Sequence, residues 1–154
     1  MNSYQNVSEA RDAVFQAFQN LTSVGIIVKG FVCPGNHYVD DYRSMLADYH
    51  RYVFGTSSMV LNTQEDDVLK LKRYCIETIK HTEQEVKSAI DAACAEGKLL
   101  IFYGHARNIH RDGYHNLDFY DMILQYINKK VKDGVCFFSS PDKCVEYYFR
   151  TTSV

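Results

Sequence analysis

The sequence lacks features that assign many chains to a class at once: it has no tryptophan, no long apolar run and no excess of positive charge. No apolar stretch approaches the ~20 residues of a membrane-spanning helix, so we expect no membrane association. The first residues, Met1–Asn6, are polar and lack the apolar centre of a secretory signal. We therefore expect no export signal in this chain and a cytoplasmic location for the chain as written.

Charge and length narrow the class of protein further. The formal net charge is −2 and the pI is about 6.3, which does not favour nucleic-acid binding. The densest basic group, Lys129, Lys130 and Lys132, ends a predicted helix, where cations complement the helix dipole. The 154 residues predict a single domain, 1–154, that buries roughly two-thirds of its unfolded surface.

Five cysteines occur, at positions 33, 75, 94, 136 and 144, and no two of them have C-x-x-C spacing. This pattern is typical of buried free thiols and of neither a disulfide framework nor a zinc knuckle. Tyrosine and phenylalanine are abundant, with 12 and 9 residues. Such rings serve either as stacking surfaces for sugars or as half-buried packing residues, and composition does not separate the two.

One pattern occurs three times along the chain: a capped amphipathic helix, a glycine and an apolar strand. The three predicted capping residues are Ser8, Thr82 and Asn116. The three glycines that end the helices are Gly25, Gly97 and Gly134. The three predicted strands span 26–33, 99–103 and 135–138. Alternating helices and apolar strands predict an α/β fold with parallel strands and right-handed crossovers.

Three further segments complete the predicted organisation. A helix is expected over 40–49, followed by a short strand at 51–54. A final helix is expected to start at Ser140–Pro141 and to run toward Arg150, because proline suits the first helical turn. The segment 56–80 contains polar turn residues and then a stretch that fits a helix or a strand equally well.

The apolar run 99–103 leads into Gly104 and then His105, and a polar loop follows over 106–115. In α/β folds, functional side chains collect where strands end at their carboxyl termini. His105 is therefore the main candidate for a functional residue. The alternative is a histidine that only forms hydrogen bonds within its loop.

Four segments carry a resemblance to a known family. The first is the strand and proline-containing loop 30–36, and the second is the ring-and-arginine pattern of 49–55. The third is the strand 101–105 that ends on His105, and the fourth is the strand-to-helix step 134–142. In this order they resemble the carboxyl-terminal half of the polysaccharide deacetylase family of the NodB-homology type. The resemblance covers nearly the whole chain.

The resemblance implies an incomplete parallel β/α barrel whose first strands are missing. It implies metal-dependent hydrolysis of N-acetyl groups on carbohydrate, with His105 as the general acid. The loop residues Pro34, Gly35, Asn36 and His37 would then line the substrate. Arg51 would be a charge partner near the site, and Tyr103 would contact the carbohydrate.

The chain also departs from the family pattern. The family binds a divalent metal, zinc or a similar ion, through an early aspartate and a His-x-x-x-His pair, and a second aspartate serves as base. No H-x-x-x-H spacing occurs here, so we identify no metal ligands, and we expect those elements to precede Met1. The acidic pair Asp40–Asp41 follows the proline loop and is expected at the start of a helix.

Two other functions remain open from the sequence. One is a non-catalytic module that binds carbohydrate or a partner through Tyr38, Tyr103, Tyr114 and His105, without a cofactor. The other is an unrelated metal hydrolase in which histidines from several loops bind zinc; these would be His37, His105, His110 and His115.

Because an incomplete barrel leaves a sheet edge open, we also expect a homodimer or a partner chain that covers it.

Overall fold

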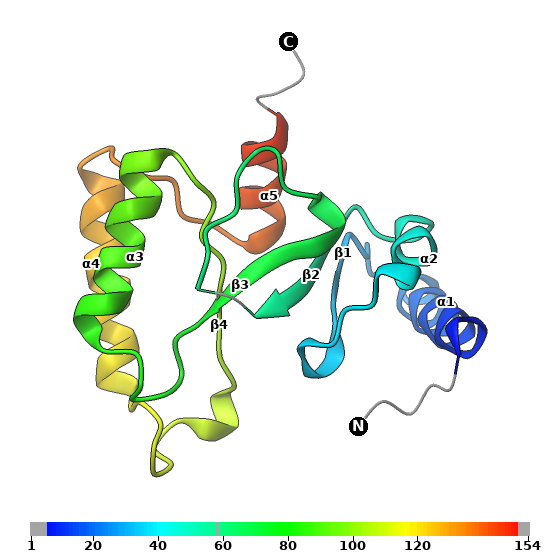
Figure 1. Ribbon diagram of the computed structural model, residues 1–154, viewed down its shortest axis with the longest axis horizontal. Coiled ribbons are helices and arrows are strands. Elements are labelled where there is room, and N and C mark those ends of the chain that lie inside the picture. Colours follow the sequence, from blue (N-terminus) through cyan, green and yellow to red (C-terminus); the bar gives the residue numbers. More distant parts are fainter. Residues whose placement is uncertain (1–5, 58, 151–154) are drawn as a thin grey trace. The chain divides into compact units, whose positions relative to one another are not determined.

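The computed structural model describes residues 6–57 and 59–150, which form two compact units. The first unit comprises the described residues up to 56 together with 66–71, and the second comprises the remainder. Each unit contains a pair of parallel strands with helices around it (Figure 1). A mixed α/β fold with parallel strands is thus confirmed, whereas the incomplete barrel stays a prediction.

The first unit is built on two short parallel strands. Its helices and strands are α1 (Val7–Ser23), β1 (Gly30–Val32), η1 (Pro34–Asn36), η2 (Asp40–Tyr42), α2 (Arg43–Ala47), β2 (Tyr52–Ser57) and η3 (Val68–Lys70). In the strand pair, Gly30 lies opposite Tyr52 and Val32 lies opposite Phe54. The buried core residues are Ala10, Cys33, Met45, Leu46, Val53 and Leu69.

Several predicted boundaries in this unit are wrong. The cap of α1 is Asn6, whose side chain accepts a hydrogen bond from the Glu9 amide, and Ser8 lies inside the first turn. The strand predicted over 26–33 is limited to β1, because the Ile26 amide still bonds to the last turn of α1. The predicted helix 40–49 divides into η2 and the short α2.

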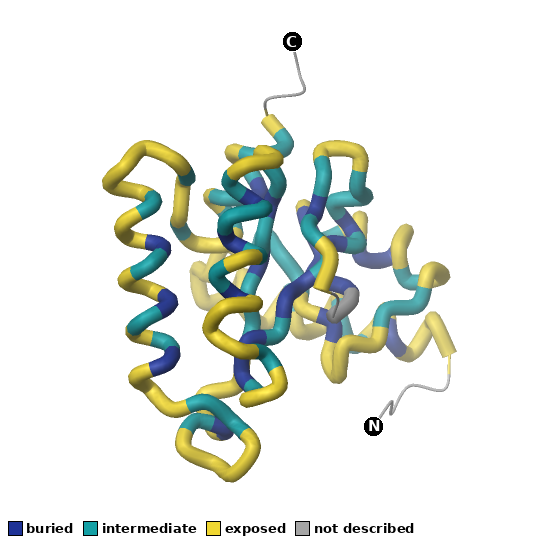
Figure 2. The backbone as a smooth tube through the Cα atoms, turned by 60° about the vertical axis from the view of Figure 1, so that its left-hand side comes forward, coloured by how far each residue is buried: buried dark blue, intermediate teal, exposed yellow. Residues whose placement is uncertain are grey.

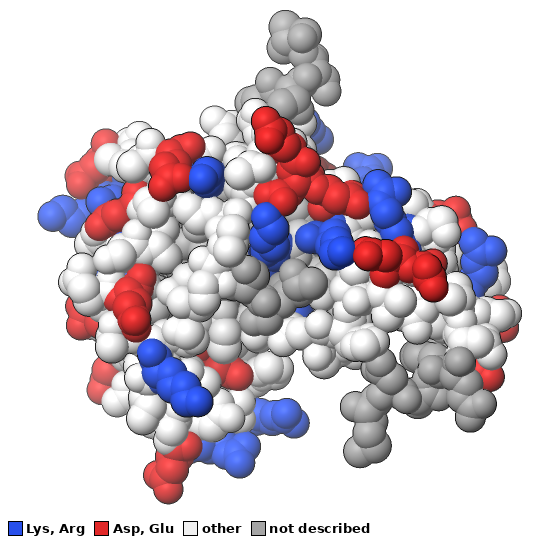
Figure 3. All heavy atoms as spheres, viewed as in Figure 1, with Lys and Arg blue, Asp and Glu red and all other residues white. Residues whose placement is uncertain are grey.

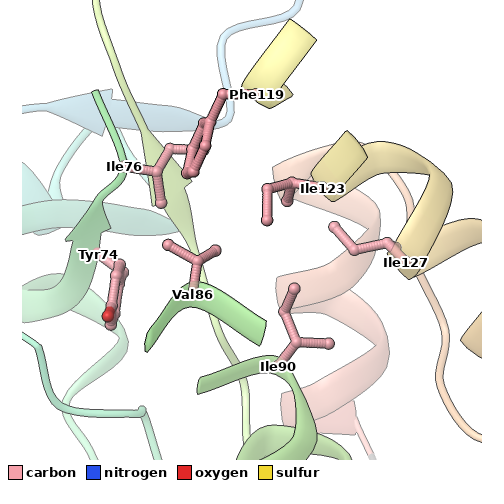
Figure 4. Packing of buried hydrophobic residues seen from close by; sticks show 7 residues of the cluster. All are labelled: Tyr74, Ile76, Val86, Ile90, Phe119, Ile123 and Ile127. Atoms are coloured by element: carbon pink, nitrogen blue, oxygen red, sulfur yellow. The ribbon is translucent and has the colours of Figure 1, made fainter. Parts of the chain in front are cut away.

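The second unit packs helices against the other strand pair. Its elements are β3 (Leu71–Cys75), α3 (Glu83–Glu96), β4 (Phe102–Tyr103), η4 (Ala106–Asn108), α4 (Leu117–Lys132) and α5 (Pro141–Arg150). The helices α3 and α4 lie side by side (Figure 1), and the buried residues of each helix recur on one of its sides (Figure 2). Figure 4 shows the core: Tyr74, Ile76, Val86, Ile90, Phe119, Ile123 and Ile127.

Local signals in the second unit are confirmed. Thr82 and Glu85 form a reciprocal capping box, and Gly97 ends α3 with a left-handed φ of 61°. Asn116 caps α4 through its hydrogen bond with the Phe119 amide. The helix that starts at Pro141 is also present.

One predicted strand in this unit is absent, and the segment that the sequence left open is assigned by the structure. No strand forms at 135–138, because the Val135 amide bonds back to the Lys130 carbonyl and the segment beyond it is irregular. The ambiguous segment before residue 80 contains β3, a strand. Within the described residues, no helix combines the length and the apolar character that crossing a membrane requires.

Candidate functional site

Glu77 and His105 lie just beyond the carboxyl ends of two neighbouring parallel strands. β3 and β4 are in register with Cys75 opposite Tyr103, and both side chains follow two residues later. The Ile76 amide continues the pairing with a 3.2 Å hydrogen bond to the Tyr103 carbonyl, and the His115 amide bonds to the Glu77 carbonyl. Because the strands run in the same direction, both side chains lie at the same end of the strand pair.

The Glu77 carboxylate and His105 are joined by two short hydrogen bonds. Glu77 Oε2 accepts from the His105 backbone amide at 2.7 Å and lies 2.8 Å from His105 Nδ1. An ionised carboxylate only accepts hydrogen bonds, so Nδ1 is the donor and holds a proton. The second ring nitrogen, Nε2, then remains for another partner, on a side chain that is 52% exposed.

The Glu77 side chain, only 10% exposed, is held in its charged form by its neighbours. Burial alone raises the pKa of Glu77, but hydrogen bonds from the His105 side chain, the His105 amide and Asn108 together lower it below its ordinary value. The pKa of Tyr120 is raised, first by burial and then by the negative charge of Glu77. The site therefore combines a buried carboxylate with a half-exposed imidazole, an arrangement that suits proton transfer.

Tyr103, predicted to contact the carbohydrate, lies beside His105. The two rings meet edge to face with their centroids 6.2 Å apart. The Arg73 guanidinium lies 4.7 Å from the Tyr103 ring centroid. One face of the Tyr103 ring is thus already covered by a cation, so a sugar that stacks on this ring has only the other face.

The loop histidines after His105 differ in their surroundings. His115 Nε2 lies 2.8 Å from the His81 carbonyl oxygen and therefore donates to it, and the His115 ring stacks on Phe119 at 3.5 Å. His110 is exposed and has a φ of 68°. Among residues 6–57 and 59–150, no group of three or more His, Cys, Asp or Glu side chains is placed to hold a metal ion.

The other predicted site residues belong to the first unit. Pro34, Gly35 and Asn36 form the exposed turn η1, in which Gly35 has a φ of 63° and Asn36 a φ of 57°. The amides of Asn36 and His37 donate to carbonyl oxygens within this turn. They would have to leave these bonds in order to bind a substrate oxygen. Arg51 is exposed, with its backbone amide bonded to the Lys29 carbonyl.

Two other predictions for the first unit concern acidic and aromatic residues. Asp40 and Asp41 lie in the first turn of η2, as expected for acids near a helix start, and Asp40 pairs with Lys70 at 2.6 Å. Tyr38 packs its ring over Gly55, where an added Cβ would lie 2.8 Å from it. Tyr38 also packs against the buried core of this unit.

Sequence reasoning missed Glu77 and Asn108. Glu77 falls in the segment that could not be assigned, although the apolar residues Leu71, Tyr74 and Ile76 precede it as a strand would. A titratable side chain just after an apolar strand is the signal that identified His105, and Glu77 shows the same signal. Asn108 had no such signal, because its burial depends on the fold of the loop.

Comparisons with known proteins identify no relative of this chain. No protein-family model matches the chain, and neither a curated protein nor a solved structure does so.

Proposed function

We propose that this chain is a polysaccharide deacetylase-like protein in which His105 supplies the proton for hydrolysis of N-acetyl groups on carbohydrate. The observation that carries the proposal is the pair of hydrogen bonds from His105 to the buried Glu77 carboxylate, at 2.7 and 2.8 Å. The four-segment resemblance to the family supports the same role for His105 and supplies the substrate class.

The proton path follows from the donor and acceptor roles of these two residues. When the amide C–N bond breaks, the departing nitrogen needs a proton, and a doubly protonated imidazole donates it from Nε2. Nδ1 keeps its proton because it stays bonded to Glu77 Oε2. Glu77 remains ionised throughout, and its charge stabilises the positive charge of the imidazole before the transfer.

The metal implied by the resemblance does not fit the described residues, since no group of three ligands is present among them. We therefore assign no step to a metal and no residue to activation of the attacking water. The roles that we propose are those of His105 as proton donor, Glu77 as its orienting carboxylate and Tyr103 beside them.

The test is acetate release from N-acetylglucosamine oligomers by the full chain, with and without added zinc. A general acid contributes about 10²–10⁴-fold to the rate, so His105→Ala is expected to lower turnover by about that factor. His110→Ala is the matched control, because it removes an exposed histidine from the same loop. Equal turnover in both variants would contradict the proposal.

The alternative is a carbohydrate-binding module, favoured by the Tyr103 ring beside the half-exposed His105 side chain. It predicts no acetate release but shifts of the Tyr103 and His105 NMR signals when the oligomers are added. Absence of acetate release from the native chain would overturn the catalytic proposal, and such shifts would then support the module.

A further inference from the structure

A buried asparagine lies behind the Glu77–His105 pair. Asn108, in η4, is only 6% exposed, and its backbone amide donates to the His105 carbonyl at 2.9 Å. Its side-chain Nδ2 donates to Glu77 Oε2 at 3.3 Å. Its Oδ1 accepts a hydrogen bond from Arg111 Nη1 at 3.1 Å. The amide thus joins an exposed cation to the buried carboxylate.

Only one orientation of the Asn108 amide satisfies both neighbours. A guanidinium can only donate and an ionised carboxylate can only accept. The amide oxygen must therefore face Arg111, and the amide nitrogen must face Glu77. Aspartate at this position would have no proton for Glu77 and would place a second negative charge beside it, and leucine would lose both bonds.

We propose that Asn108, held by Arg111, is a positioning residue that fixes the Glu77 carboxylate against His105 and so keeps the imidazole proton on Nδ1. Among the described residues of this unit, the side chains that face Glu77 are those of His105, Asn108 and Tyr120. Three hydrogen bonds reach Glu77 Oε2, two of them from His105, and the third comes from Asn108. It therefore keeps the carboxylate in place while the His105 ring gives and regains its proton.

The inference rests on the proposed function for its role in catalysis, but its test needs no turnover. The ¹³C signal of the Glu77 carboxyl group reports its pKa, and the ¹⁵N signals of His105 report which ring nitrogen carries the proton. In Asn108→Asp, we expect the pKa of Glu77 to rise and the Nε2-protonated form of His105 to appear at pH 8. Asn128→Asp, which adds the same charge on the exposed side of α4, is the control.

Arg111 supplies a second variant that does not alter the buried position. Arg111→Leu removes the bond that orients the Asn108 amide, and we expect the same changes as in Asn108→Asp, but smaller. Arg111→Lys keeps a donor there and should restore the native signals in part. The inference is overturned if Arg111→Leu, or a folded Asn108→Asp, shifts both signals no more than Asn128→Asp does.

The two proposals can fail separately. If the Asn108 and Arg111 variants shift the Glu77 and His105 signals while no variant or native chain releases acetate, the positioning role stands and the catalytic proposal fails. If the native chain releases acetate and Asn108→Asp has an unchanged pH profile and rate, the positioning role is overturned.

Discussion

Replacing Glu77 by glutamine tests the candidate site through stability, without any assumption about substrate. The variant keeps the shape of the side chain and removes its charge. The Glu77 side chain is 10% exposed, so the two short bonds to His105 are largely protected from water. Removal of the Glu77 charge should therefore lower the free energy of unfolding of the second unit by a measurable amount.

The magnitude follows from the contacts of Oε2. A hydrogen bond to a charged group contributes about 1.5–3 kcal/mol and a neutral one about 0.5–1.5 kcal/mol. The bonds from the His105 amide and Nδ1, at 2.7 and 2.8 Å, become neutral in the variant, at a cost of about 1 kcal/mol each. With the weaker Asn108 bond included, we expect Glu77→Gln to lower the free energy of unfolding by about 2–3 kcal/mol at pH 7.

The difference between native chain and variant should depend on pH in one direction. The folded state lowers the pKa of Glu77, because hydrogen bonds from His105 and Asn108 outweigh the effect of burial, which raises it. The charged form therefore contributes stability above the unfolded pKa of about 4.3, and this contribution is lost as the pH falls through the folded pKa. The difference should therefore narrow as the pH falls below about 4.

Urea unfolding followed by tyrosine fluorescence measures both quantities, with Glu65→Gln as the control for an exposed glutamate. The control is expected to change stability by less than about 0.5 kcal/mol. A Glu77→Gln loss as small as that of the control, or a difference independent of pH down to pH 3, would refute the account of this carboxylate.

Three further predictions concern packing. His50 is 7% exposed, and burial lowers its pKa below the usual value. The stability contributed by the neutral ring should therefore be present above about pH 6.5 and lost as the pH falls. Thermal unfolding at pH 8 and 5.5 should show a smaller loss of stability at the lower pH in His50→Leu than in the native chain. Asn62 is 1% exposed, and its side chain forms hydrogen bonds with both the backbone amide and the carbonyl of Lys72. Asn62→Ala should therefore lower the free energy of unfolding, measured in urea, by about 3 kcal/mol. A loss below about 1 kcal/mol would contradict this. A Cβ on Gly30 would lie 2.0 Å from the Tyr52 ring, so Gly30→Ala should destabilise the first unit by about 1–3 kcal/mol. Adding Tyr52→Leu should recover part of this loss, as measured by thermal unfolding.

Local chemistry explains which elements the sequence could predict. The Thr82–Glu85 capping box and the Asn116 cap each require residues only three positions apart, so the signal is complete within one turn. The left-handed end of α3 at Gly97 is predictable for the same reason. The apolar run 135–138 reads as a strand, but an apolar run does not show whether a neighbouring strand exists to pair with it.

The candidate site depends on contacts that are distant in sequence. His105 could be predicted because it follows a recognisable apolar run. Its partner Glu77 lies 28 residues earlier, and only the parallel pairing of β3 and β4 brings the two together. Asn108 is close to His105 in sequence, yet its burial arises from the turn at η4, which no residue pattern predicted.

The most direct test of the site is the ¹⁵N NMR spectrum of the His105 ring at pH 8, with the exposed loop residue His110 as an internal comparison. The hydrogen bond from Nδ1 to Glu77 Oε2 predicts a proton on Nδ1 and an unprotonated Nε2. In Glu77→Gln this preference should weaken, while the His110 signals stay unchanged. A His105 ring protonated on Nε2 in the native chain would contradict the donor assignment and, with it, the proposed proton-transfer role.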